Sequence, residues 1–203
     1  MHLPIELTAA TVIFWLTLAV SLAGLYLKPA IIERCLLRPY TLARRGEYER
    51  LVTSGLVHAD FGHLLFNMLT FYFFAFPLEG RIGSINFLFL YLLGLIASEL
   101  GTYLKHRNNP DYATLGASGA IAAVMFAFIV YFPDAKLFLL IVPIPVPAPL
   151  FAVAYLAYTW YSARQARGRI NHDAHLGGAI VGLLYVAWRD PQAYARLLDV
   201  IGM

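Results

Sequence analysis

The chain has 203 residues, of which 60% are hydrophobic and 13% charged, and its mean hydropathy is +0.66. Soluble globular domains contain about 45–50% apolar and roughly 25% charged residues, so this composition excludes an ordinary soluble domain and predicts an integral, multi-pass membrane protein in contact with lipid. The net charge of +3 is too small and too scattered to indicate a nucleic-acid partner. Cys35 is the single cysteine, which excludes an internal disulfide.

Six segments approach the length of about 20 mainly apolar residues that a helix needs to cross a bilayer. They are residues 9–27, 63–78, 82–104, 116–132, 137–161 and 174–188. The first has no basic region before it and no cleavage-site pattern after it, so we expect a retained span rather than a signal peptide. The second is short in apolar residues but extendable backward through Leu56. The sequence therefore predicts one all-α domain over residues 1–203 with six transmembrane helices.

Two parts of the chain depart from this simple pattern. Prolines stand at alternate positions from Pro143 to Pro149, which an uninterrupted helix would not tolerate, so the regular helix of the fifth segment should begin near Ala148. The long connection over residues 28–55 mixes charged side chains with isolated apolar ones. Such a mixture favours a first loop that lies partly embedded at the membrane interface.

The distribution of charge does not settle the orientation of the chain. With the N-terminus on side one of the membrane, the connections on side one carry 4 Lys or Arg residues and those on side two carry 11. The positive-inside rule would then put the N-terminus outside the cytoplasm. However, 6 of the 11 lie in the embedded connection over residues 28–55, and without them the tally is 5 against 4.

Polar side chains in or beside the predicted spans need a reason, because such groups are costly in lipid. His63 and Asn67 are four residues apart and therefore share one helix face, while His58 precedes that helix. Ser118 and His175 stand near the starts of the fourth and sixth segments. The second, fourth and sixth segments cross the membrane in the same direction, so these residues should lie at similar depth on side two.

These residues are of the types that catalyse acyl transfer. A serine hydroxyl is a poor nucleophile until a base removes its proton, and histidine is the usual base, which suggests Ser118 and His175. The attack creates an oxyanion that needs preorganised hydrogen-bond donors. The side chains of Asn67 and His63 offer such donors, and so does the backbone N–H of Ser118, which has no partner within its helix.

Four glycines support the arrangement by their small size. Gly116 and Gly119 keep bulk away from the turn that carries Ser118. Gly178 and Gly182 form a small-xxx-small face on the sixth segment, which allows close helix approach. We expect this face to bring His175 toward Ser118.

Each residue also has a simpler interpretation. Ser118 alone fits a packing serine, His63 and Asn67 fit an interhelical hydrogen-bonded pair, and His175 fits the cap of a loop. The shared depth of all four is what favours a catalytic site.

A metal site is the sharper alternative, because histidine suits zinc. His58, His63, His172 and His175 could supply imidazoles. The sequence contains neither an H-E-x-x-H motif nor a cluster of thiolates. We therefore expect no metal and no cofactor.

Three motifs together resemble the rhomboid intramembrane serine proteases. They are GASG at 116–119, HADFGHLLFN at 58–67 and AHLGGAIVG at 174–182, and the resemblance runs over residues 49–188. It implies a compact rhomboid-like bundle of six transmembrane helices with a Ser–His dyad.

The resemblance also assigns roles to individual residues. Ser118 would be the nucleophile and His175 the base, while His63 and Asn67 would help the Ser118 N–H bind the oxyanion. His58 would be a structural polar residue near the site. Arg50 matches an arginine of the family's first loop, and Glu79 matches a glutamate on the side opposite the active site.

Two positions depart from the family pattern. The first loop carries Glu49-Arg50 where Trp-Arg is frequent. Ala122 stands where some members have a tyrosine that stacks on the catalytic histidine. No acidic residue stands in position to orient His175, so we expect a dyad and not a triad.

The resemblance implies a hydrolase, a serine endopeptidase that cleaves membrane-anchored proteins in or near their transmembrane helices. Its partners would be transmembrane protein substrates and membrane lipid. We expect it in the plasma (inner) membrane, with the N-terminus in the cytoplasm and the site opening to the extracytoplasmic side. The alternative is a catalytically inactive rhomboid-like protein that binds membrane clients.

Overall fold

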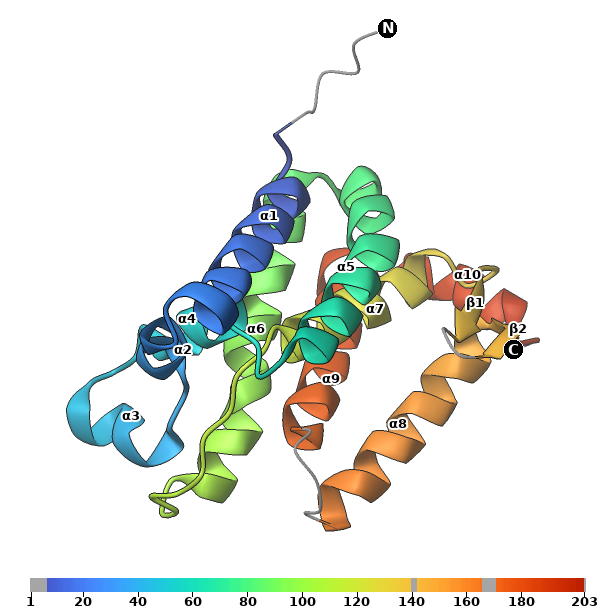
Figure 1. Cartoon of the computed structure of the whole chain (residues 1–203). Helices are drawn as coiled ribbons and strands as arrows, with labels where there is room; N and C mark the ends of the chain where they lie inside the picture. The colour runs from blue at the N-terminus through green and yellow to red at the C-terminus, as the bar shows by residue number, and fades with distance from the viewer. Residues whose placement is uncertain (1–6, 140–141, 166–170, 203) are drawn as a thin grey trace, which may run out of the picture.

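The computed structural model describes residues 7–139, 142–165 and 171–202, and these residues are mainly helical (Figure 1). The N-terminal part of the chain, in order, consists of α1 (Ala9–Leu22), a π-helical turn η1 (Ala23–Leu27), α2 (Ala30–Cys35), α3 (Pro39–Arg45), α4 (Arg50–Thr53), a 3-10 turn η2 (Ser54–Leu56) and α5 (Phe61–Ile82). The remainder consists of α6 (Ser84–His106), α7 (Ser118–Tyr131), β1 (Lys136–Leu139), β2 (Val142–Pro147), α8 (Ala148–Gln165), α9 (His172–Arg189) and α10 (Ala193–Val200).

Each of the six predicted spans contains a helix, but the helices differ in length. Among the described residues, three helices are long and apolar enough to cross a membrane: Ala9–Leu27, Phe61–Ile82 and Ser84–His106. The helical fold class is therefore confirmed, while the count of six spans stays a prediction. The helix α10 and the strands β1 and β2 were not predicted.

The helix α7 is short, and protein surrounds it. Every residue from Gly119 to Tyr131 is buried, and α7 packs against α5, α6 and α9. Its 14 residues span about 21 Å at 1.5 Å per residue, less than the roughly 30 Å of a bilayer core. In a membrane of that thickness, at least one end of α7 lies below the lipid surface.

The second span does not use the backward extension through Leu56, and His58 precedes the helix as expected. Asp60 has an extended backbone, and its side chain accepts a hydrogen bond from the backbone N–H of His63, so it caps α5 at Phe61. The residues before this cap form the separate turn η2. The helix extends forward instead, to Ile82.

The prolines act as predicted at the start of α8 and also shape an unexpected hairpin. The helix begins at Ala148, as expected, and Pro149 stands in its first turn, where proline is tolerated. The preceding residues pair as antiparallel strands, with Lys136 opposite Pro147 and Phe138 opposite Pro145. Proline lacks an N–H and is confined to edge strands, a condition that a two-stranded sheet meets.

The first connection is tied to the segment that leads into α7. Leu37 and Thr114 exchange two backbone hydrogen bonds of 3.0 and 2.9 Å. The guanidinium of Arg50 donates to the carbonyl oxygen of Leu36 at 3.0 Å and pairs with Glu47 at 3.1 Å. Arg50 therefore links two parts of this connection, and neither contact involves its neighbour Glu49.

A buried carboxylate joins α1 to α5 at the opposite end of the molecule. Both side-chain oxygens of Glu79 lie 3.2 Å from the backbone N–H of Ala10, in the first turn of α1. Figure 1 shows the start of α1 close to the turn between α5 and α6, at the end of the molecule away from α3. The position expected for Glu79, far from the predicted site, agrees with this contact.

The contact between α7 and α9 predicts the effect of adding one methyl group. A Cβ on Gly182 would overlap the carbonyl oxygen of Ala123, a backbone atom that cannot rotate away. Gly182→Ala should therefore lower the free energy of unfolding by about 1–3 kcal/mol. Thermal unfolding in detergent measures this change.

Gly101→Ala is the matched control, because nothing lies within 4 Å of a Cβ at Gly101 in α6. Alanine is the better helix former by roughly 1 kcal/mol, so this variant should be as stable as the wild type or more so. Equal unfolding temperatures for the two variants would contradict the close contact.

Candidate active site

Ser118 begins α7, and the turn before it requires glycine. Gly116 has a φ of +113°, a conformation that other residues rarely adopt. A Cβ at Gly116 would lie 2.8 Å from Cε1 of His63 and 3.0 Å from its Nε2. The glycine therefore lets the His63 ring rest on the backbone next to Ser118.

The glycines of α9 bring it into backbone contact with α7, as predicted. A Cβ on Gly178 would overlap the carbonyl oxygen of Gly119. A Cβ on Gly119 would in turn overlap the hydroxyl of Ser98 in α6. Gly119 directly follows Ser118, and Gly178 lies about one turn after His175, so these contacts limit how near the two residues can stand.

Two cavities meet at Ser118 and His175. The smaller, of about 350 Å³, lies between α5, α7 and α8 and is mostly apolar; its lining includes Phe74, Met125 and Phe151. The larger, of about 900 Å³, has charged and polar groups in its lining. Ser118, His175, Asn67 and Phe66 line both cavities, whereas His63 lines only the larger one.

The structure thus brings together the residues predicted to share one depth. Asn67 is buried, and its Nδ2 donates one hydrogen bond of 2.9 Å to the carbonyl oxygen of His63. An amide carries two N–H donors, so a second donor of Asn67 remains beside the cavities. Their chemical roles stay predictions.

Comparison with known proteins identifies the family. The sequence model of the Rhomboid domain matches residues 45–189. The chain belongs to the rhomboid family.

Curated relatives of this rhomboid come from several organisms. It is 34% identical over 138 residues to "Rhomboid protein 1, mitochondrial" of Saccharomyces cerevisiae, a match that covers 66% of this chain and 40% of the relative. It is 31% identical over 160 residues to "RHOMBOID-like protein 12, mitochondrial" of Arabidopsis thaliana, with 71% and 47% covered. It is 42% identical over 89 residues to "Putative rhomboid protease YdcA" of Bacillus subtilis, with 43% and 44% covered.

The matches span less than half the length of each of these relatives. Together with the apolar helices, they show that this rhomboid is an integral membrane protein. They do not support the predicted plasma membrane, because the first two relatives are named as mitochondrial.

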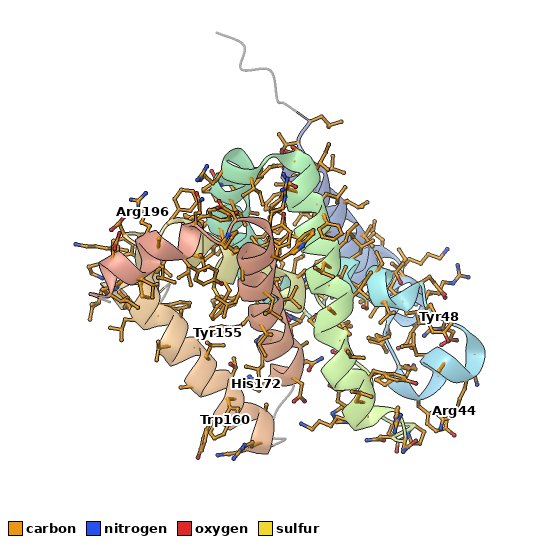
Figure 2. All side chains as sticks on the ribbon, turned by 180° about the vertical axis from the view of Figure 1, so that it is seen from behind. Arg44, Tyr48, Tyr155, Trp160, His172 and Arg196 are labelled. Atoms are coloured by element: carbon orange, nitrogen blue, oxygen red, sulfur yellow. The ribbon has the colours of Figure 1, made fainter. Side chains whose placement is uncertain are left out.

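The ring of His175 has a neighbour that the sequence did not reveal. Tyr155 of α8 stacks on it, with ring centroids 6.3 Å apart and planes inclined by 21°. His172 meets the same ring edge-on at 5.9 Å. In Figure 2, the labelled Tyr155 and His172 lie on the side of the molecule formed by α8 and α9. In this rhomboid the aromatic contact thus comes from another helix, since Ala122 supplies no ring.

His58 lies behind His63 and away from the cavities. The two rings meet edge-on at 4.9 Å. The Ser21 hydroxyl donates to the carbonyl oxygen of Leu56 at 2.8 Å, so the Nδ1 of His58, 2.9 Å from that hydroxyl, must be the donor of their bond. Burial, and secondarily the nearby His63, lower the pKa of His58 to about 3. His58 is therefore buried and neutral, and its structural role stays a prediction.

A metal centre receives no support from the side chains that the structure describes. Among them, no group of three or more His, Cys, Asp or Glu residues is arranged to hold a metal ion. The four histidines considered from the sequence divide into two edge-on pairs, one from the segment 58–63 and one from α9.

The low pKa of His58 predicts a loss of stability in acid. An unfolded histidine titrates near 6.5, and the folded one near 3, so the unfolded state binds the extra proton between these values. The free energy of unfolding should therefore fall as the pH drops below about 6.5, with a contribution from His58 of at most about 1.4 kcal/mol per pH unit. Thermal unfolding of the wild type and His58→Gln over this range measures the difference.

Above about pH 7 the slope should be the same for both proteins, because His58 is neutral in both states there. A His58→Gln variant with the wild-type slope in acid would show that His58 takes up its proton in the folded state as readily as in the unfolded state.

Proposed function

We propose that this rhomboid is an intramembrane serine endopeptidase that cleaves membrane-anchored proteins in or near their transmembrane helices. One observation carries the proposal: Ser118 and His175 stand where an apolar cavity meets a larger one that charged and polar side chains help to line. The apolar cavity suits the side chains of a transmembrane segment, and the polar groups of the larger cavity suit water. Peptide hydrolysis within a membrane needs both at the same serine.

The chemistry follows from the residues at this junction. His175 takes the proton from the Ser118 hydroxyl, and the Ser118 oxygen attacks the carbonyl carbon of the substrate. The oxyanion is held by the backbone N–H of Ser118 together with Asn67 and His63. His175 then gives its proton to the leaving amine, and water from the larger cavity hydrolyses the acyl-enzyme with His175 again as base.

A helical substrate must partly unwind at the cut, because the carbonyl groups of a helix are already hydrogen-bonded. We therefore expect helix-weakening residues near the cleavage site. The larger cavity is lined by Asp60 and Gly62 at the start of α5 and by His172 at the start of α9, the face opposite the N-terminus of α1. We propose that this face is the extracytoplasmic one.

The dyad is tested by removing each member. Ser118→Ala and His175→Ala should each lower kcat on a fluorogenic transmembrane substrate by about 10⁶-fold, because neither can act without the other. The measurement uses purified protein in detergent, together with covalent labelling of Ser118 by a fluorophosphonate.

Ser162→Ala is the matched control, since Ser162 also lines the larger cavity and has no proposed role. It should keep the wild-type rate. Equal rates in the wild type, Ser118→Ala and His175→Ala would refute the dyad. Binding of transmembrane clients without Ser118-dependent turnover would favour the inactive rhomboid-like protein.

The contact of Tyr155 with His175 makes a second prediction. Tyr155→Leu removes the ring that stacks on the imidazole and should lower kcat by roughly tenfold, since a small misplacement of a catalytic group is costly. Tyr155→Phe keeps the ring and should retain most of the activity. If both variants lose activity equally, the hydroxyl and not the stacked ring is what matters.

A further inference from the structure

A buried polar cluster lies beside the site and takes no part in the chemistry described above. It consists of Glu99 and Thr102 of α6, Thr114 before α7, and Asn171 before α9. Glu99, Thr102 and Thr114 are all buried. Buried polar groups are costly unless they are hydrogen-bonded, so a cluster of this kind needs a reason beyond the filling of space.

The side chain of Asn171 is the centre of the cluster. Its Nδ2 faces three oxygens, with distances of 2.9 Å to Thr102 Oγ1, 3.2 Å to Thr114 Oγ1 and 3.4 Å to Glu99 Oε2. Its Oδ1 accepts a hydrogen bond of 3.1 Å from the backbone N–H of Ala174 and so caps α9. One amide thus holds α6, the segment before α7 and the first turn of α9.

The two segments that Asn171 joins are the ones that carry Ser118 and His175. Asn171 is four residues before His175, whose backbone N–H donates to the Asn171 carbonyl oxygen at 3.2 Å. Thr114 is four residues before Ser118. A displaced amide at Asn171 would therefore shift the start of α9 relative to the turn before Ser118.

The glycine contact between α7 and α9 does not by itself prevent this shift. Gly119, Gly178 and Gly182 allow α9 to approach α7 closely, but a glycine face has no side chain that fixes rotation or sliding. Directed hydrogen bonds supply that restraint, because they weaken steeply when donor and acceptor move apart or turn.

We propose that Asn171, held by Glu99, Thr102 and Thr114, is a positioning residue that sets the depth and rotation of α9 so that His175 faces Ser118. This inference rests on the proposed protease function. It assigns a role to the buried carboxylate of Glu99 as the acceptor that orients the Asn171 amide.

An exchange of donor and acceptor tests the proposal. Asn171→Asp keeps the oxygen that caps α9 but loses the N–H donors and sets a second carboxyl group beside Glu99. It should lower kcat by roughly 10- to 100-fold, the size expected for a misplaced catalytic group. KM should change by less than about twofold, because Asn171 lines the larger cavity, which in our proposal holds water, and not the apolar cavity that receives the substrate.

The double variant Asn171→Asp with Glu99→Gln restores the pair with its roles reversed, since the amide of glutamine donates to the carboxylate of aspartate. It should recover kcat to within about threefold of the wild type, as expected for directly coupled residues. Failure of the double variant to recover any activity would overturn the proposal. If the Asn171→Asp protein does not accumulate, Thr102→Val replaces it as the single variant, because it removes one hydroxyl of the cluster at similar volume. Thr102→Val should lower kcat without changing KM. A wild-type kcat in Thr102→Val would overturn the proposal.

Glu79→Gln is the matched control, because it neutralises a buried carboxylate at the other end of the molecule. It should lower the unfolding temperature without changing kcat. If Glu79→Gln and Asn171→Asp lose kcat in proportion to their loss of unfolding temperature, Asn171 is merely structural and the proposal is wrong.

A second readout is independent of turnover. The ring signals of His175 in a [¹⁵N]histidine spectrum, identified with His175→Gln, should shift in Asn171→Asp, return in the double variant and stay unchanged in Glu79→Gln. If the wild type shows no Ser118-dependent turnover, the proposed function fails and these signals alone decide the position of His175. An unchanged His175 signal in Asn171→Asp would overturn the positioning role.

Discussion

The backbone contact between α7 and α9 is the constraint on which the site depends. The carbonyl oxygen of Gly119 occupies the space that a side chain at Gly178 would need. The carbonyl oxygen of Ala123 likewise occupies the space that a side chain at Gly182 would need. Two helices at this distance leave no room for lipid or for intervening side chains. Ser118 and His175, both within one turn of the contact, can therefore line the same cavities.

The burial of α7 explains how a hydrolytic site could exist inside a membrane. The helix is wrapped by α5, α6 and α9, and its length is shorter than the bilayer core. Its first residue, Ser118, can thus lie below the lipid surface, where it lines the larger cavity together with polar and charged side chains. The helices α1, α5 and α6 carry exposed apolar side chains, which indicates that these helices, and not α7, face the lipid.

Close packing alone does not orient catalytic groups, and directed contacts complete the arrangement. The stacked ring of Tyr155 and the hydrogen bonds of Asn171 act on α9 from α8 and α6. His63 rests on Gly116, behind which the neutral His58 is held by Ser21. In our proposal the dyad therefore depends on polar and aromatic neighbours as much as on its own two residues.

Much of this was predictable from local pattern. The helical class, the start of α8 at Ala148 and the close face of Gly178 and Gly182 follow from apolar run length, proline chemistry and residue size. These are properties of single segments. The capping by Asp60 begins α5 at Phe61, within two residues of the predicted span, and leaves the apolar residues before it outside the helix. The hairpin was missed because alternating prolines exclude a helix without specifying a strand partner.

By itself, the sequence predicted which residues would carry the chemistry and that their segments begin on one and the same side of the membrane, because both predictions follow from residue type and the order of the spans. Only the tertiary structure decided which neighbours hold them. Tyr155 is 20 positions from His175 in the chain, and Glu99 is 72 positions from Asn171. Contacts between such distant residues depend on the rotation and depth of whole helices, which no local pattern of residues contains.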